Sequence, residues 1–208
     1  MVEKYNRLNL KDKLQMAKPK LDRKTLLKNS LSVFKFRGYH GTSVSDLAAA
    51  SGLLKGSIYH YIESKESLML EVLNALKEHY TSKVFAKTND HTLSPYERLY
   101  ELVIRTEEIF MYEETGDFFV NIGLETMHTN PEFGEVIHAF FKDWIASLSA
   151  VYVSVLSEDD ALLKAERVVA ELEGSVVMMK LLGDVDYLVR TSRRVLNEFK
   201  ELERTNLV

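Results

Sequence analysis

The 208-residue sequence contains no cysteine, only three prolines and nine glycines, and no run of eighteen apolar residues. The lack of cysteine excludes disulfide bonds and thiol chemistry. The scarcity of helix-breaking residues favours long helices. A membrane span needs about 20 consecutive apolar residues, and a secretory leader needs a charged start followed by an apolar stretch. Since neither pattern occurs, we expect a cytoplasmic protein.

Signatures of common enzyme classes are also missing, because the sequence has no Gly-rich phosphate loop and no nucleophile elbow. Two Glu-x-x-His pairs, Glu125 with His128 and Glu135 with His138, have the spacing that binds iron in helical bundles, and such a site would make the chain an oxidase. Chance accounts for two such pairs in this composition, and they lie too close together along the chain to come from long neighbouring helices. We therefore expect no enzyme activity, no metal site and no cofactor.

Charge is distributed unevenly along the chain. Residues 1–70 hold 13 lysines and arginines against 6 aspartates and glutamates, a net charge of +7, whereas residues 71–208 hold 14 against 25, a net charge of −11. A basic N-terminal third attracts phosphates and releases their counterions, while an acidic remainder repels DNA. The alternative is that these charges only solvate helix surfaces. The motif within the basic part favours nucleic acid.

That motif is the stretch GYHGTSVSDLAAASGLLKGSIYHYIESKESL at residues 38–68, which predicts two short helices around a turn and the start of a third. Ser43 and Asp46 have the spacing of a capping box at the start of the first helix. Gly52 falls at the sharp turn, where a left-handed backbone is least costly for glycine. Residues 55–61 then form the second short helix. Small, basic and hydroxyl side chains on its exposed side suit a major groove.

The motif extends on both sides into an ordered set of positions. They are Phe34, Gly38, Tyr39, Thr42, Ser43, Asp46, Leu47, Ala48, Gly52, Lys55, Gly56, Tyr59, Tyr61, Lys65, Glu66 and Leu68. With this set, residues 21–70 resemble the DNA-binding domain of the TetR family of bacterial transcriptional regulators. Two positions depart from the family pattern: Ile62 stands where Phe is usual, and Leu54 stands where a capping residue is common. Loss of that cap costs about 1 kcal/mol, so we expect the second helix to become firmer on DNA.

The resemblance implies a set of DNA-contacting residues. The matching base-reading positions are Lys55, Gly56, Ser57 and His60, the phosphate-contacting positions are Thr42, Tyr59, Tyr61 and Lys65, and Ser43 stands where some members read a base. The chemistry agrees, because a lysine can donate to guanine while hydroxyls and Lys65 suit phosphate oxygens. The rings of Tyr59 and Tyr61 can instead serve packing.

The organisation of the chain follows from the same pattern. We expect an all-α fold with a basic N-terminal extension at residues 1–20, a three-helix helix-turn-helix domain at 21–68, and a larger helical effector-binding and dimerisation domain at 69–208. The extension carries six lysines and arginines and is either a DNA-contacting arm or a frayed terminus. Beyond the helix that Ser64 starts, the expected helices span about 95–113, 117–128, 131–157, 160–183 and 184–203.

The last two expected helices carry apolar stripes at an alternating spacing of three and four residues. The stripes comprise Leu162, Ala165, Val169, Leu172, Val176, Met179 and Gly183, and then Leu188, Ser192, Val195, Phe199 and Leu202. Two such helices from each of two chains would form a four-helix dimer interface. The alternative is packing within one chain. Because the resemblance implies a dimer, we favour the interface.

Aromatic residues are concentrated in the middle of the chain, where residues 80–144 contain 12 of the 21 aromatic side chains. They either line a cavity or form plain core. The resemblance implies a small-molecule effector here. The residues that we expect to contact it are Tyr100, Phe118, Asn121, Ile122, Glu125, His128, Trp144 and Met178. Asn121, Glu125 and His128 recur at helical spacing as polar anchors or as a solvated face.

The sequence thus predicts a regulator that binds a near-palindromic operator in double-stranded DNA as a homodimer. A small molecule of unknown identity would release it. Repression is the simpler outcome because occluding a promoter requires no contact with polymerase. Activation by a regulator of the same family is the alternative.

Overall fold

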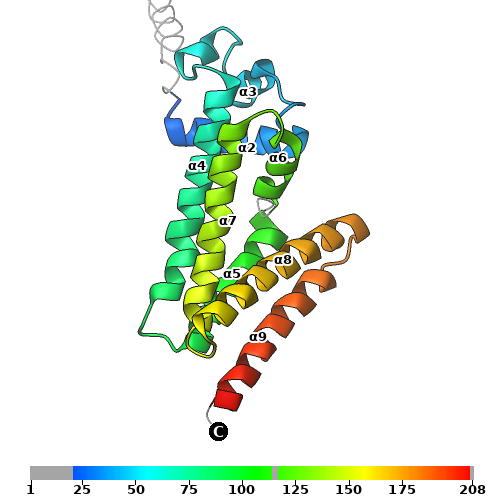
Figure 1. Ribbon diagram of the computed structural model, residues 1–208. Coiled ribbons are helices and arrows are strands. Elements are labelled where there is room, and N and C mark those ends of the chain that lie inside the picture. Colours follow the sequence, from blue (N-terminus) through cyan, green and yellow to red (C-terminus); the bar gives the residue numbers. More distant parts are fainter. Residues whose placement is uncertain (1–20, 114–116, 207–208) are drawn as a thin grey trace, which may run out of the picture.

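The computed structural model describes residues 21–113 and 117–206, and within these ranges every regular element is helical (Figure 1). The predicted all-α fold is confirmed. The elements in order are α2 (Arg23–Arg37), α3 (Val44–Ala50), the 3₁₀ turn η1 (Ser57–His60), α4 (Lys65–Lys83), the 3₁₀ turn η2 (Phe85–Asn89), α5 (Pro95–Glu108), the π-helical turn η3 (Ile109–Glu113), α6 (Phe118–Thr126), α7 (Pro131–Tyr152), α8 (Glu158–Leu182) and α9 (Asp186–Asn206).

Side-chain caps set most helix starts. The capping oxygens, each accepting the backbone N–H three residues further on, belong to Asp22, Ser43, Ser64, Ser94 and Ser157. Gly38 and Gly183 end α2 and α8 with positive φ angles of 70° and 67°, a backbone conformation that costs glycine little. α7 ends at Tyr152, five residues before the expected 157, because residues 153–156 turn into the Ser157 cap.

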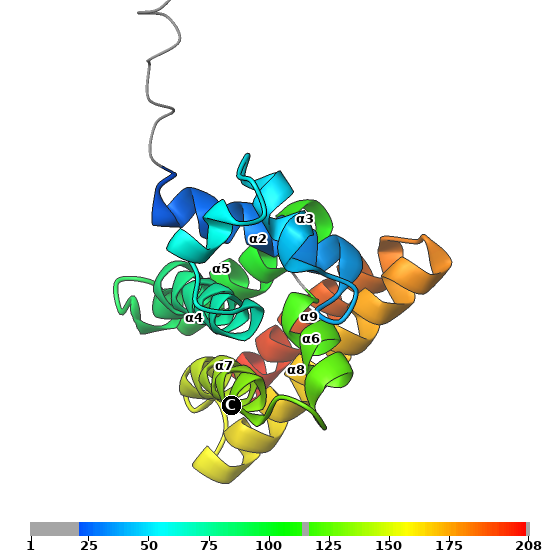
Figure 2. The ribbon, with the colours of Figure 1, turned by 90° about the horizontal axis from the view of Figure 1, so that it is seen from above.

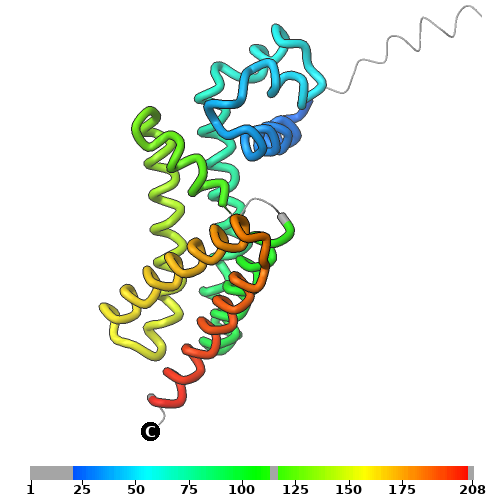
Figure 3. Tube along the Cα trace, turned by 90° about the vertical axis from the view of Figure 1, so that its right-hand side faces the viewer, coloured from blue at the N-terminus to red at the C-terminus, as the bar shows by residue number. Residues whose placement is uncertain are grey.

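The N-terminal elements form a small unit with its own core, which we call the head and define as residues 21–68. Its core side chains are fully buried and come from all four of its helical segments: Leu26, Phe34, Leu47, Ile58 and Leu68. Its last segment is the first turn of α4, which runs on into the rest of the molecule. The head therefore sits at one end of α4 (Figures 1 and 3).

The remaining helices form the body, residues 69–206 where described. α4 and α7 lie side by side, and α8 and α9 pack against each other on the flank (Figures 1 and 2). The predicted aromatic region is packed core here. Phe119 stacks on Phe140 with ring centroids 3.9 Å apart, and Trp144 is buried beside Phe140 at 6.1 Å. Among the described helices, none is long and apolar enough to cross a membrane.

Most of the predicted stripe residues of α8 and α9 pack inside the protomer. Ala165, Leu172 and Val176 of α8 and Val195 and Phe199 of α9 are all buried. These five residues therefore serve packing within one chain, whereas Leu162 and Gly183 are exposed, and a dimer interface made by α8 and α9 stays a prediction. A different face of α8 remains exposed.

Candidate nucleic-acid interface

The DNA-reading element is shorter than expected. In place of a helix over residues 55–61, the chain forms one 3₁₀ turn, η1, whose start has no side-chain cap. The cap position of η1 is Gly56, which has no side chain to accept a hydrogen bond, and the Leu54 side chain before it is apolar and 79% exposed. Ile58 is fully buried and holds the turn on the head's core. Firming of this turn on DNA stays a prediction.

The outer side of η1 and of the turn before it is polar and open. Lys55, Gly56, Tyr59 and His60 are exposed, Tyr59 at 55%, and Ser57 is partly exposed. A Cβ atom on Gly56 would meet nothing within 4 Å, so a duplex has unhindered access to the backbone there. A lysine, hydroxyls and an imidazole are thus accessible on this surface, and these groups suit base edges and phosphates.

Ser43 begins α3 in the predicted capping box. Its hydroxyl accepts the Asp46 N–H at 3.2 Å, while its own backbone N–H donates to the Asp46 carboxylate at 2.9 Å. The Ser43 hydroxyl and N–H lower the pKa of Asp46, so this carboxylate stays charged. Ser43 itself is exposed at the helix start, where unpaired backbone N–H groups favour anions.

Thr42 and Lys65 differ from the simple phosphate contacts that we predicted. Thr42 is 2% exposed, and its hydroxyl donates to the Gly38 carbonyl at 2.6 Å, so its side chain faces inward. The Lys65 ammonium donates to the carbonyls of Tyr39 and Thr42 at 3.0 and 3.1 Å and lies 4.2 Å from the centre of the Tyr39 ring. Lys65 therefore fixes the α2–α3 loop and adds a positive charge beside it.

Tyr61 is half-buried, and its carbonyl accepts a hydrogen bond from the Arg23 guanidinium, which also pairs with Glu71 of α4. These contacts tie the start of α2 to the end of η1 and the beginning of α4. The hydroxyl of Tyr61 is therefore presented from a fixed backbone. Sequence reasoning missed Arg23, whose role depends on this long-range contact.

Glu125 of α6 contacts the head and does not face a pocket in the body. Its carboxylate accepts the backbone N–H groups of Tyr39 at 2.8 Å and His40 at 2.6 Å. We predicted that Glu125 is a polar anchor for an effector. The structure corrects this prediction, because both carboxylate oxygens already accept hydrogen bonds from the α2–α3 loop. The partners are 86 and 85 residues away in sequence, which no local pattern reveals.

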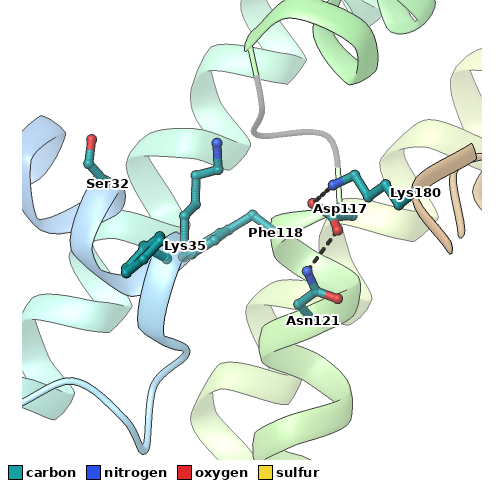
Figure 4. A pocket seen from close by; sticks show the side chains of 7 residues that line it. Ser32, Lys35, Asp117, Phe118, Asn121 and Lys180 are labelled. Atoms are coloured by element: carbon teal, nitrogen blue, oxygen red, sulfur yellow. Dashed lines mark hydrogen bonds and ion pairs between the residues drawn. The ribbon is translucent and has the colours of Figure 1, made fainter. Parts of the chain in front are cut away.

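A cleft of about 360 Å³ lies where α2 of the head meets α6 and α8 of the body (Figure 4). Its lining residues are Ser32, Lys35, Phe36, Asp117, Phe118, Asn121 and Lys180. The Asp117 carboxylate accepts from Lys180 at 2.6 Å and from Asn121 at 2.8 Å across this cleft. Two of the predicted effector residues, Phe118 and Asn121, thus line an open polar space.

The other predicted effector residues are not brought together. Ile122 and Trp144 are buried in the core, whereas Tyr100 on α5, His128 in the turn after α6 and Met178 on α8 are exposed. Asn121, Glu125 and His128 share a spacing but have separate surroundings. The structure therefore does not assemble the eight residues into one pocket.

The Glu-x-x-His pairs do not form a metal site. Within residues 21–113 and 117–206 no group of three histidine, aspartate or glutamate side chains is placed to hold a metal ion. Glu125 is held by the head, and His128, Glu135 and His138 are exposed. The oxidase alternative has no support.

The chain is similar to known proteins in its head and in its fold. A family model described as bacterial regulatory proteins, tetR family, matches residues 26–72. The repressor KstR2 of Mycobacterium tuberculosis is 26% identical over 133 residues, which are 64% of this chain and 64% of that protein. The repressor DhaR of Mycobacterium sp. strain GP1 is 24% identical over 165 residues, 76% of this chain and 82% of its own length.

Solved structures agree with the fold. A TetR transcriptional regulator from Chloroflexus aurantiacus superposes with a TM-score of 0.76 at 24% identity, covering 86% of this chain and 93% of that one. A TetR-family regulator from Agrobacterium tumefaciens gives a TM-score of 0.75 at 18% identity, covering 84% and 95%. The family match over residues 26–72 covers the helix-turn-helix head, and the solved structures that share the all-helical architecture are regulators of the TetR family.

Proposed function

We propose that the protein is a transcriptional repressor that binds a near-palindromic operator as a homodimer and leaves it when a small molecule binds. The observation that carries the proposal is the surface of η1 and of the turn before it, which is anchored by the buried Ile58 and on which Lys55 and His60 are exposed and Ser57 is partly exposed. These three residues would read base edges in a major groove. The names of the matched relatives, among them the repressors KstR2 and DhaR, support the direction of regulation.

Charge supports the placement of DNA on the head. Residues 21–68 carry 7 lysines and arginines against 4 aspartates and glutamates, a net charge of +3, while the chain as a whole is at −4. The phosphates around η1 would be contacted by Tyr59, Tyr61, Lys65 and Ser43. Thr42 would contribute through its backbone and not through its side chain. The basic extension at residues 1–20 lies outside the described residues, and its role as an arm stays a prediction.

The exposed face of α8 supports a homodimer. Leu163, Ala170, Gly174, Val177 and Leu181 recur at spacings of seven, four, three and four residues, and all five are exposed, Leu163 at 64% and Leu181 at 76%. Apolar residues at this spacing form a helix-packing seam, and the small central residues allow a second helix to approach closely. A second copy of the chain would cover this face. Its head would then reach the next major groove, about 34–36 Å away.

The effector would enter the cleft between α2, α6 and α8. A molecule that fills this space would contact α2 of the head and α6 of the body at the same time. It would therefore change the angle between the head and the body. Lys180 and Asn121 would supply polar contacts, and Phe118 an apolar wall. A panel of candidate compounds measured by thermal shift on the wild type and on Lys180→Ala tests this placement. A compound that stabilises both proteins equally contradicts it.

Footprinting on the DNA that flanks the protein's own gene tests the proposed function. We expect protection of two related half-sites about one helical turn apart, weakened in Lys55→Ala and kept in Glu135→Ala, which removes an exposed carboxylate of α7. Addition of an active compound should remove the protection. Protection without symmetry, or none at all, would contradict the proposal.

A further inference from the structure

The contact between Glu125 and the head is a link between domains made by one carboxylate. Both oxygens are used: Oε2 accepts the N–H of Tyr39 at 2.8 Å, and Oε1 accepts the N–H of His40 at 2.6 Å. Hydrogen bonds to a charged acceptor are about twice as strong as those between neutral groups. Two adjacent backbone donors on one carboxylate also fix its orientation. The link therefore restrains both distance and angle.

The loop of the head is shaped to receive this carboxylate. Gly38 has φ 70° and ψ 177° at the end of α2, a conformation open essentially to glycine alone. A Cβ atom at this position would lie 2.7 Å from Oε2 of Glu125. The positive φ favours glycine here, and the absence of a side chain leaves room for the Glu125 carboxylate. The neighbouring Tyr39 ring packs edge-on against Phe133 of α7, with centroids 5.0 Å apart.

The other end of α6 is joined to the helix that carries the exposed apolar face. Asp117, directly before α6, pairs with Lys180 of α8 at 2.6 Å. α6 has nine residues, so it is about 14 Å long. A short rigid helix thus connects α8 at one end to the α2–α3 loop of the head at the other. The cleft of Figure 4 lies alongside it.

We propose that Glu125 is a positioning residue that sets the angle of the head on the body, and through it the half-site spacing that the dimer accepts. This inference rests on the proposed function, since spacing has meaning only for a dimer on DNA. Glu125 itself touches no base or phosphate. Without its carboxylate the head remains folded on its own core but pivots more freely about α4, so operators of different spacing become similar in affinity.

The test compares operators that differ only in spacing. An operator selected by the wild type from random duplexes is remade with two base pairs inserted between its half-sites. We expect the insertion to cost the wild type on the order of tenfold or more in affinity, and Glu125→Ala less than about threefold. Glu125→Gln, which keeps the shape and one acceptor oxygen, should lie between them. Glu135→Ala, which removes an exposed carboxylate from α7, should match the wild type.

Equal discrimination by the wild type and Glu125→Ala would overturn the inference while leaving the proposed function intact. A second measurement needs no DNA. Hydrogen exchange at the amides of Tyr39 and His40 should be faster in Glu125→Ala by on the order of tenfold and unchanged in Glu135→Ala. Unchanged exchange at both amides would show that the link does not hold the loop, and would also overturn the inference. Failure of the wild type to select any operator would instead remove the proposed function.

Discussion

Glu173 on α8 is a carboxyl group that the fold keeps protonated. Its Oε2 is buried without a hydrogen-bond partner among the described residues. Burial and, to a smaller extent, the negative charge of Asp117 raise its pKa from the ordinary 4.5 to about 8, with Lys180 partly offsetting both. Because the folded protein holds this proton more tightly than the unfolded chain, its contribution to stability is complete below pH 4.5. It is lost progressively up to about pH 8.

Glu173→Gln replaces this group with a neutral amide of similar shape, which cannot ionise in either state. Each unit of pKa difference corresponds to about 1.4 kcal/mol, so between pH 5 and pH 8 the wild type should lose about 3 kcal/mol relative to the variant. Chemical denaturation of both proteins at the two pH values, at one fixed protomer concentration, measures this difference. All other titrating groups contribute equally to the unfolding free energies of the wild type and the variant, so their contributions cancel when the two proteins are compared. A difference in unfolding free energy that is the same at pH 5 and pH 8 would refute the reasoning.

Three further substitutions test the interface and the dimer. Lys55→Ala should cost about 1–3 kcal/mol in operator affinity and relax the preference at one base pair, seen by competition with mutated operators; a uniform loss would make Lys55 a phosphate contact. Lys65→Ala should lower the melting temperature and reduce the salt slope of DNA binding by about one unit, and an unaltered slope would confine Lys65 to its bonds with the loop. Leu181→Asp should yield monomers in sedimentation, because it buries a charge in the α8 seam; a persistent dimer would place the interface elsewhere.

The sequence was sufficient for most of the fold because local chemistry determines where these helices begin and end. Ser43 with Asp46, Ser94 with Glu97 and Gly183 act within a few residues of themselves, so their roles can be read from spacing. The uncapped start at Leu54 likewise indicated a weak reading element. In the structure this element is a single 3₁₀ turn without a side-chain cap.

The parts that the sequence did not reveal depend on contacts between distant segments. Helical periodicity on α8 shows that a face is apolar, but both a core and a dimer would bury such a face. Ala165 and Leu172 face the core, while Val177 and Leu181 lie on the opposite, exposed face. The role of Glu125 was equally ambiguous from the sequence. The N–H groups that donate to its carboxylate belong to the α2–α3 loop, and only the tertiary fold brings this loop close to α6.

We propose that the basic head reads the sequence of double-stranded DNA. Selection from a pool of random duplexes at low ionic strength, followed by sequencing of the retained molecules, tests this reading. We expect enrichment of a near-palindrome whose half-sites are about one helical turn apart, with the preference at one base pair of each half-site relaxed in Lys55→Ala. Recovery of a pool with no enriched sequence would contradict it.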